Sequence, residues 1–469
     1  MKVAIIGAGI SGIAAARAAM NKGVAFDLFE SAAHLGGIWH FDDAPDRTSV
    51  YYNLFCNTTK QMMSFSDVAF EDDIPDMPYH TQVDRYLNDY VDQFGLREHI
   101  RFEDPVTEVR KVDGAWEVAS RTHRETYDAV FVANGHHSAR NMPEVPGEFS
   151  GEILHSQAYK GPGPDFAGKR VLIVGLGNTA ADIGTDLVGV ASAIDVSIRR
   201  TPFLMRRYTT AGVPYEHAVI RDHEPAAAIA CDIAGLDFPP SPIPIPTPGD
   251  EMDVYPTFAD HFVAQVAEGN VAMRAGLERF DGSTVHFQDG SHADYDVVLF
   301  ATGYRVEFPF LEDGVAEVDA RIGWRRLYKN IVPPSEPTLF FIGLVQPVGA
   351  MPPTAEAQSN WCMGALTGDF SLPSEEEMDA EIDARVRGGL EKGSQQRAVE
   401  ELNQVHYMTD LWQQLTGKKT PLTPYFLRLL QRYKKALKRG YPHPQEHVVP
   451  ADVRDGPHLE GNAAARRKA

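Results

Sequence analysis

The sequence has few of the features that mark disulfide-bonded, zinc-binding or membrane-spanning proteins. Its 469 residues include three cysteines, Cys56, Cys231 and Cys362, and no C-x-x-C pair, so neither a disulfide framework nor a structural zinc site is expected. No run approaches the roughly 18 apolar residues of a membrane-spanning helix. The apolar start, Val3–Met20, has the glycine spacing of a nucleotide-binding turn rather than the pattern of a signal peptide. We therefore expect a cytoplasmic protein without a stable membrane anchor.

Positive charge is also scarce. The chain has 44 Lys and Arg residues against 65 Asp and Glu residues, which gives a formal net charge of −21. A nucleic-acid partner would require a basic surface to replace counterions, so no such partner is expected. The contents of hydrophobic residues (43%) and charged residues (23%) are ordinary for a globular protein, and a chain of this length forms two or three domains.

What the sequence does contain begins with a nucleotide-binding pattern. A β-rich run, Lys2–Ile6, leads into a Gly-x-Gly-x-x-Gly turn, Gly7–Gly12, and then into an alanine-rich helix, Ile13–Asn21. Glycines allow the tight bend and the close approach of backbone to a pyrophosphate, while the helix N-terminus offers free N–H groups. The next strand, Ala25–Phe29, is followed by Glu30, where an acidic residue binds ribose hydroxyls. This succession of strand, glycine turn, helix and second strand predicts a dinucleotide-binding site.

A second turn of this kind follows the strand Arg170–Val174. The turn is Gly175–Ala180, with alanine as its third small residue, and it again leads into a helix. The strand Ile194–Arg199 then corresponds to the second strand of the first pattern, and Arg199 and Arg200 lie where that pattern has Glu30. The positive charge and planar fork of donors of an arginine guanidinium suit a 2′-phosphate, so this pattern predicts a binding site for NADPH. The alternative is a solvated basic pair at the end of a strand.

An internal repeat links the two units. Tyr127–Gly135 resembles Tyr295–Gly303, and each follows a hairpin-like segment, Val106–Ser120 in the first case and Leu277–Asp289 in the second. We therefore predict an α/β fold with two Rossmann-like dinucleotide-binding domains, the second inserted into the first. The expected parts are residues 1–160 and 291–450 for the first domain, 161–290 for the insert and 451–469 for a flexible tail.

Several segments are less decisive. Tyr51–Phe70 mixes aromatic, amide and hydroxyl side chains without periodicity, which suits a pocket wall or a partly buried loop. Pro239–Pro248 predicts an extended, polyproline-like loop. Gln346–Pro353 is expected to be a loop, followed by a helix over Ala355–Thr367. Pro424–Arg439 predicts a helix with an apolar and a basic face, which either lies on an anionic membrane or packs on its own domain.

These features together resemble the flavin-containing monooxygenases. The segment Phe149-x-Gly151-x-x-x-His155-x-x-x-Tyr159 matches that family's identifying pattern, FxGxxxHxxxY/F, at every specified position. One departure is Asn360, where a basic residue is expected. The resemblance runs through residues 1–415, and its other matches are Gly36-Gly37-x-Trp39, Phe300-Ala-Thr-Gly-Tyr304, Ile342-Gly-Leu-Val-Gln-Pro347 and Glu356-x-Gln358-x-x-Trp361.

The resemblance implies an FAD site first and an NADPH site second. The segments Cys56-Asn57-Thr58-Thr59-Lys60 and Phe65-Ser66-Asp67 resemble the part of that family that carries an asparagine beside the flavin, which implies Asn57 as the active-site amide. In that family NADPH reduces FAD, O2 adds to form a C4a-hydroperoxyflavin, and a small-molecule amine or sulfide takes the distal oxygen, as in N,N-dimethylaniline monooxygenation. The implied cofactor-binding residues are Gly7, Gly9, Gly12, Glu30, Gly37, Trp39, Gly175, Gly177, Asn178, Thr179, Ala180, Ser197, Arg199, Arg200, Ala301, Thr302, Gly303 and Gln346.

Three alternatives stay open at this stage. One is Baeyer–Villiger oxygenation of ketones, against which Tyr159 argues because the related pattern has Trp there. Another is an NAD(P)H flavin reductase or peroxidase that cycles Cys56, and the third is a non-catalytic flavoprotein. His136, His137 and His155 are expected to be structural, and no metal site is predicted. The physiological substrate stays open, and so does the oligomeric state, a homodimer included.

Overall fold

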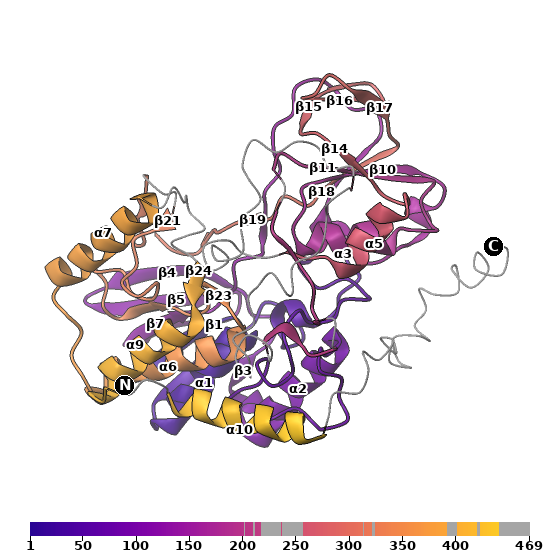
Figure 1. Cartoon of the computed structure of the whole chain (residues 1–469). Helices are drawn as coiled ribbons and strands as arrows, with labels where there is room; N and C mark the ends of the chain where they lie inside the picture. Colours follow the sequence, from indigo (N-terminus) through magenta and orange to yellow (C-terminus); the bar gives the residue numbers. More distant parts are fainter. Residues whose placement is uncertain are drawn as a thin grey trace. The chain divides into compact units, whose positions relative to one another are not determined.

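The computed structural model describes residues 1–200, 202–209, 212–216, 236, 257–312, 314–320, 324–391, 401–419 and 423–439. The chain divides into two compact units (Figure 1). Unit 1 consists of Met1–His40, Thr58–His136 and Val306–Lys438, and unit 2 of Phe41–Asn57, His137–Arg305 and Arg439–Ala469. The predicted domain boundaries near residues 160, 290 and 450 stay predictions. The predicted Pro239–Pro248 loop and the tail 451–469 lie outside the described residues.

Unit 1 is built on a parallel sheet with the strand order β22-β7-β1-β2-β3. Residues of β1, β7 and β22 are almost all buried, as expected for parallel strands that are covered on both faces. The five strands are β1 (Lys2–Ile6), β2 (Ala25–Phe29), β3 (Ile100–Arg101), β7 (Ala129–Val132) and β22 (Leu339–Phe341).

The rest of unit 1 surrounds this sheet. An antiparallel sheet joins β4 (Val106–Val112), β5 (Ala115–Ser120) and β6 (Arg124–Tyr127), and Asp113 and Gly114, both with positive φ, form the turn between its first two strands. Helix α1 packs against α6, and α6 packs against α9. Among the residues described in unit 1, the α-helices are α1 (Ile10–Asn21), α2 (His80–Gln93), α6 (Met351–Thr367), α7 (Glu375–Glu391), α9 (Gln404–Thr416) and α10 (Pro424–Arg439), and the short strand pairs are β20 (Val318–Asp319) with β21 (Trp324–Arg325) and β23 (Gln346–Val348) with β24 (Glu401–Asn403).

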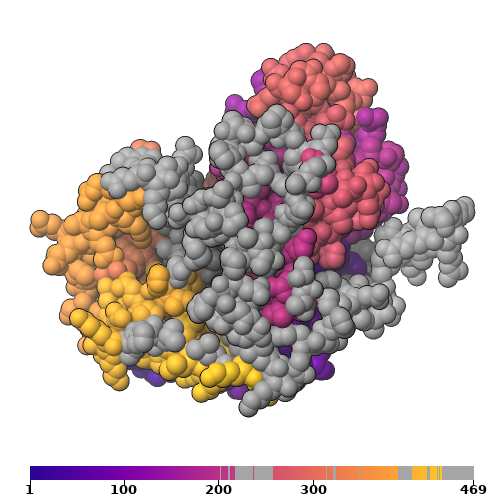
Figure 2. All heavy atoms as spheres, viewed as in Figure 1, coloured from indigo at the N-terminus to yellow at the C-terminus, as the bar shows by residue number. Residues whose placement is uncertain are grey.

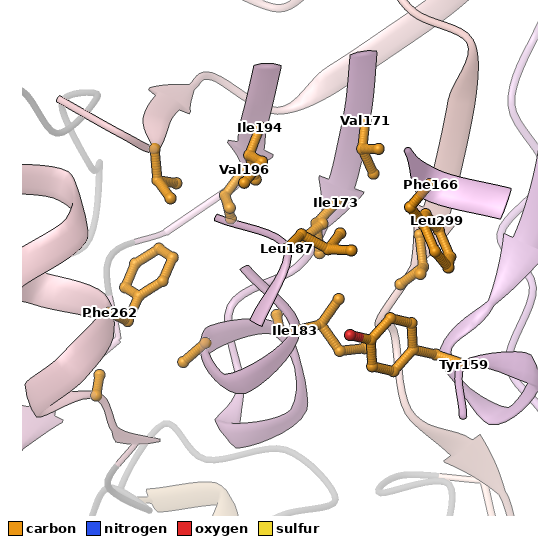
Figure 3. Packing of buried hydrophobic residues seen from close by; sticks show 14 of the residues in the cluster. Tyr159, Phe166, Val171, Ile173, Ile183, Leu187, Ile194, Val196, Phe262 and Leu299 are labelled. Carbon is orange, nitrogen blue, oxygen red and sulfur yellow. The ribbon is translucent and has the colours of Figure 1, made fainter. Parts of the chain in front are cut away.

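Unit 2 repeats the architecture with a parallel sheet in the order β14-β11-β10-β18-β9. Its core lies between this sheet and helix α3 (Asn178–Asp186), where Figure 3 shows Ile183 and Leu187 packed against Ile173 and Val196. The strands are β9 (Glu152–His155), β10 (Arg170–Val174), β11 (Ala193–Ser197), β14 (Ala272–Arg274) and β18 (Val297–Phe300).

In the part of unit 2 that the structure describes, helices α3 and α5 and several short strands accompany this sheet. An antiparallel meander of β15, β16 and β17 lies above the sheet in the view of Figure 1. The remaining elements are α3 (Asn178–Asp186), α5 (Asp260–Ala267), β15 (Leu277–Asp281), β16 (Thr284–Phe287), β17 (His292–Asp294), and the pairs β8 (Ala139–Arg140) with β19 (Tyr304–Arg305) and β12 (Leu204–Met205) with β13 (Thr257–Phe258).

The internal repeat seen in the sequence corresponds to the same strand in both sheets. β7, from the first copy, pairs in parallel with β1, and β18, from the second copy, pairs in parallel with β10. Since most of unit 2 lies in the chain between β7 and β22, the second Rossmann-like sheet is an insertion into the first. The predicted fold class is confirmed.

Two predicted segments differ from the structure. Gln346–Pro353 is not a loop throughout, because its first residues form β23 and α6 already begins at Met351. Pro352 and Pro353 fit the first turn of α6, where proline's missing N–H is not needed. The predicted strand Ile194–Arg199 ends at Ser197, so Arg199 lies just beyond β11.

Candidate functional site

The first glycine turn, in unit 1, has no room for side chains. Gly7 has φ +103°, and a Cβ there would lie 2.6 Å from the Ala133 carbonyl oxygen. A Cβ at Gly12 would lie 1.7 Å from the carbonyl oxygen of Gly7. Gly9 faces the predicted glycine pair, since a Cβ on Gly37 would come within 3.1 Å of the Gly9 Cα. The resulting bare-backbone cradle fits the pyrophosphate of a dinucleotide.

Glu30 lies at the carboxyl end of β2 and reaches back to this turn. Its side chain is buried, and the carboxylate accepts hydrogen bonds from the N–H groups of Ala8 and Ala32, both at 2.8 Å. The Ser31 hydroxyl donates a third hydrogen bond at 3.1 Å. These hydrogen bonds hold the Glu30 carboxylate beside the cradle, and its predicted contact with a ribose stays a prediction. Trp39, in the short 3-10 helix Gly37–Trp39, is half-buried in the same unit.

The second glycine turn, in unit 2, reproduces the geometry of the first. Gly175 has φ +105°, and a Cβ there would lie 2.8 Å from the carbonyl oxygen of Ala301, the counterpart of Ala133 in the repeat. Gly177 caps α3, and Ala180 is fully buried in its first turns. Backbone N–H groups at the N-terminus of α3 and the bare turn fit a second pyrophosphate.

Around the second turn, the two arginines are exposed, whereas Ser197 and Asn178 are hydrogen-bonded within the protein. Arg199 and Arg200 are exposed directly after β11, as a pair that meets a 2′-phosphate must be. Ser197 and Asn178 already have partners: the Ser197 hydroxyl donates to the Ala275 carbonyl at 2.8 Å, and the Asn178 Oδ1 accepts the Phe258 N–H at 2.7 Å. The cofactor contacts predicted for these residues stay predictions.

The remaining predicted cofactor ligands are spread over both units. Thr179 is half-buried in the first turn of α3, and Gln346 is half-buried in β23 of unit 1. Thr302 exchanges two hydrogen bonds with Asn141: its hydroxyl donates to the Asn141 carbonyl at 2.6 Å, and its carbonyl accepts the Asn141 side chain at 3.1 Å. The Gly303 carbonyl accepts a hydrogen bond from His155.

His155 of the FxGxxxHxxxY segment is a structural residue. Its Nε2 lies 2.9 Å from the Gly303 carbonyl oxygen, and its Nδ1 lies 3.1 Å from the backbone N–H of Gln157. A carbonyl can only accept and a backbone N–H can only donate, so the ring is the neutral Nε2–H tautomer. Burial lowers the pKa of His155 below its ordinary value, and Arg140 acts in the same direction. The side chain is thus committed to holding two segments together.

The other positions of that segment also have packing roles. A Cβ on Gly151 would lie 2.5 Å from the Asp296 carbonyl oxygen, which explains the glycine. The Phe149 ring packs on Phe280 with centroids 5.2 Å apart. Tyr159 is buried at the edge of the unit 2 core, where Figure 3 shows it, and its hydroxyl donates to Asp186 on α3. The motif therefore holds residues 149–159, which we call the linking segment, onto the rest of unit 2.

Asn57 contacts an arginine that sequence reasoning missed. The side chain of Arg207 is 2% exposed, and its Nε donates to the Asn57 Oδ1 at 2.8 Å. The other guanidinium nitrogens approach Asp182 at 3.2 Å and Asp260 at 3.4 Å, and the guanidinium carbon lies 4.6 Å from the centre of the Phe55 ring. No local signal distinguishes Arg207 from its neighbour Arg206, because partners from distant segments decide which one is buried.

A cavity of about 230 Å³ lies next to this arginine within unit 2. The Tyr51 hydroxyl donates to Asp182 at 2.5 Å, and the Asn53 side chain donates to Asp186 at 2.6 Å. Burial raises the pKa values of both Tyr51 and Asp182 above their usual ranges. Three residues of the predicted Tyr51–Phe70 wall thus line a pocket, and its lining includes Tyr51, Asn53, Phe55, Asp182, Asp186 and Arg207.

Cys56 is unsuited to redox chemistry. Its thiol is 2% exposed, burial raises its pKa well above the ordinary value, and Glu216 acts in the same direction. Cys362 is buried with a raised pKa as well. Since the thiolate is the reactive form, neither residue fits a cysteine-based reductase or peroxidase. Cys231 lies outside the described residues.

Helix α10 packs on unit 1 with Phe426 and Leu429 buried, and two of its arginines bond to the Ser64–Ser66 turn. Arg432 donates to the Ser64 hydroxyl at 2.6 Å and to the Ser66 carbonyl at 3.1 Å, and Arg428 reaches the same carbonyl at 3.3 Å. Glu356, from the predicted Glu-x-Gln-x-x-Trp run, holds the other side of this turn by accepting the Ser66 N–H at 2.8 Å. Of the two readings of Pro424–Arg439, the structure has the helix packed on its own domain. No helix in the described part of the chain is long and apolar enough to cross a membrane.

Comparisons with known proteins give consistent matches. The family described as flavin-binding monooxygenase-like matches residues 1–225 and 247–437. Flavin-containing monooxygenase 5 of Oryctolagus cuniculus is 34% identical over 409 residues, which cover 81% of this chain and 76% of that protein. Flavin-containing monooxygenase 3 of Rattus norvegicus is 33% identical over 413 residues, with coverages of 82% and 77%.

Solved structures show the same fold. S-allyl-L-cysteine S-oxygenase from Allium sativum aligns with a TM-score of 0.71 and 25% identity, over 100% of this chain and 98% of that one. Cyclohexanone monooxygenase from Rhodococcus sp. Phi1, bound to NADP⁺, aligns with a TM-score of 0.59 and 18% identity, over 94% and 98% of the two chains. The second likeness is one of fold alone.

Proposed function

Because the chain belongs to the family of flavin-binding monooxygenases, we propose that it oxygenates soft nucleophiles, tertiary amines or sulfides, to their N- or S-oxides. It is an FAD-containing, NADPH-dependent monooxygenase. The observation that carries the proposal is the pair of matching glycine turns, which differ in the charge that follows the second strand. Glu30 accompanies the first turn, and Arg199 accompanies the second.

The two turns assign a cofactor to each unit. We assign FAD to the Gly7–Gly12 cradle, with Glu30 as the acceptor for its ribose hydroxyls. We assign NADPH to the Gly175–Ala180 turn, with Arg199 and Arg200 facing the 2′-phosphate. When bound, FAD supplies two-electron chemistry with NADPH and the activation of O2 for transfer of one oxygen atom. The protein's own task is to bind, orient and exclude water around that chemistry.

We assign Asn57 the role of the active-site amide. A neutral hydrogen-bonding group beside the activated oxygen can stabilise developing charge without supplying the proton that would release hydrogen peroxide. The assignment is supported by the family resemblance of Cys56–Lys60 and by the polar contact that orients the amide. Cys56, its neighbour, is buried and has a raised pKa, which argues against the cysteine-based alternative.

The test is substrate oxygenation by the purified enzyme with NADPH and O2. A tertiary amine, a thioether and a cyclic ketone of similar size are compared, with products identified by mass spectrometry and NADPH consumption followed in parallel. The proposal predicts N-oxide and S-oxide, with no lactone from the ketone. Lactone formation would favour Baeyer–Villiger chemistry instead, and hydrogen peroxide as the sole product with every nucleophile would contradict the proposal.

A further inference from the structure

Arg207 is a buried cation. Two of its guanidinium nitrogens face acidic side chains, and the third nitrogen, Nε, faces Asn57. A fully buried arginine is tolerated only when it is paired. Two of its nitrogens approach Asp182 on α3 and Asp260 at the start of α5, and its flat face lies over Phe55. These contacts fix the plane of the guanidinium. Its Nε–H therefore points in a set direction, toward the Oδ1 of Asn57 at 2.8 Å.

This contact determines which way the Asn57 amide faces. A guanidinium has donors and no acceptor, so the Asn57 atom that it meets must be the carbonyl oxygen. The flipped amide would place its amino group against the Arg207 Nε–H, donor against donor, and would leave the buried guanidinium with an unsatisfied N–H. The amino group must therefore point away from Arg207. Within the part of the chain that the structure describes, that group donates no hydrogen bond.

We propose that Arg207 is a positioning residue: it holds the Asn57 amide with the carbonyl turned inward and the amino group presented as a donor. The inference rests on the proposed function, in which that amide acts on the activated oxygen. Asp182 and Asp260 contribute indirectly to the orientation of the amide, because they hold the Arg207 guanidinium in place. Without Arg207, the amide can adopt both flip states, and only one of them offers the donor.

Arg207→Lys is the most informative variant. Lysine keeps the charge that Asp182 and Asp260 balance, but it is a point charge without the rigid fork that aims Nε at Asn57. Arg206→Lys is the matched control, since Arg206 is the adjacent residue and has only a half-buried side chain. FAD content and the unfolding temperature of each variant show whether it is folded and loaded.

The first measurement observes the amide itself. In protein labelled with ¹⁵N-asparagine, the Asn57 side-chain NH₂ signals are assigned by their loss in Asn57→Ala. We expect these signals to shift in Arg207→Lys and to stay in place in Arg206→Lys. Unchanged Asn57 signals in Arg207→Lys would overturn the proposal. If Arg207→Lys does not fold, Asp260→Asn loosens the same guanidinium and should shift the signals in the same way by a smaller amount.

The second measurement asks whether Arg207 acts through Asn57. Hydrogen peroxide released per product formed should rise about fivefold in Arg207→Lys, the factor that one lost hydrogen bond of average strength represents. In the Asn57→Ala background the same change should add nothing, because the group that it positions is gone. Equal effects in both backgrounds would make Arg207 a merely structural residue. If Asn57→Ala alone leaves product formation coupled to NADPH, the proposed role of Asn57 fails, while the amide signals still decide whether Arg207 orients it.

Discussion

His155 donates from Nε2 to the Gly303 carbonyl oxygen at 2.9 Å and so joins the linking segment to the loop that follows β18. Because its Nδ1 accepts the Gln157 N–H at 3.1 Å, protonation of the ring would break the second of these two hydrogen bonds. The family-specific histidine therefore connects two parts of unit 2 only while it is neutral.

This connection should make stability depend on pH. The pKa of His155 is lowered in the folded protein, mainly by burial, so the unfolded chain takes up a proton first as the pH falls. The stabilisation is present above the ordinary value of about 6.5 and is lost as the pH falls toward the folded value, at about 1.4 kcal/mol per pH unit. Urea unfolding at pH 7.5 and 5.5 should show a larger loss for the natural protein than for His155→Gln.

The control for this measurement is His292→Gln, since His292 is exposed on β17. It should retain the pH dependence of the natural protein. If His155→Gln retains that dependence in full, His155 titrates normally and its two hydrogen bonds do not hold the ring neutral.

Arg199 should set the choice between NADPH and NADH. A hydrogen-bonded charge pair with the 2′-phosphate contributes about 1–3 kcal/mol, so kcat/KM should favour NADPH by a corresponding factor. Arg199→Ser should lower that preference, whereas Arg279→Ser should leave it unchanged, since Arg279 lies on β15 and pairs with Asp281 at 3.6 Å. Equal kcat/KM values for the two cofactors in the natural protein would refute the assignment of the second site.

Cys56 should resist modification in the folded protein. Burial disfavours the thiolate and raises the pKa of Cys56, and Cys362 is buried in the same manner. Iodoacetamide at pH 8 should leave the Cys56 peptide unmodified before unfolding and should label it afterwards, as read by mass spectrometry. Cys56→Ala should keep its oxygenase activity. Rapid labelling of Cys56 in the folded protein, together with loss of activity, would support the cysteine-based reductase instead.

Arg432 should contribute to the stability of unit 1 by holding α10. It donates to the Ser64 hydroxyl and to the carbonyls of Phe65 and Ser66, while Phe426 and Leu429 of the same helix are buried. The C-terminal helices, in yellow, form part of the surface in Figure 2. Arg432→Ala should cost about 1–3 kcal/mol of unfolding free energy, the scale of hydrogen bonds to a charged group. Lys434→Ala, at an exposed position of α10, should cost less than about 0.5 kcal/mol. Equal costs in denaturant unfolding would show that the docking contributes nothing.

The glycine turns could be predicted from the sequence because their constraint is local. Positive φ and the close approach of another backbone both require glycine, as at Gly7 against Ala133 and at Gly175 against Ala301. The repeat of β7 and β18 could be predicted for a similar reason, since buried parallel strands give continuous apolar runs.

The pairing of Asn57 with Arg207 could not be predicted from the sequence. The two residues are 150 positions apart, and Arg207 is buried only because Asp182 and Asp260 balance its charge. The start of α6 at Met351 was missed for a different reason. Two consecutive prolines indicate a loop unless the helix end is known, and tertiary packing decides where a helix begins.

The role of Asn57 is the central claim, and one ratio tests it most directly: product formed per NADPH consumed in Asn57→Ala. A lost donor that acts on developing charge costs about 2.7–4 kcal/mol, so the variant should bind FAD, oxidise NADPH and release hydrogen peroxide in place of product. Asn57→Asp should be equally poor, because its carboxylate pairs with Arg207 and has no amino group to offer. If Asn57→Ala forms as much product per NADPH as the natural protein, Asn57 is not the active-site amide.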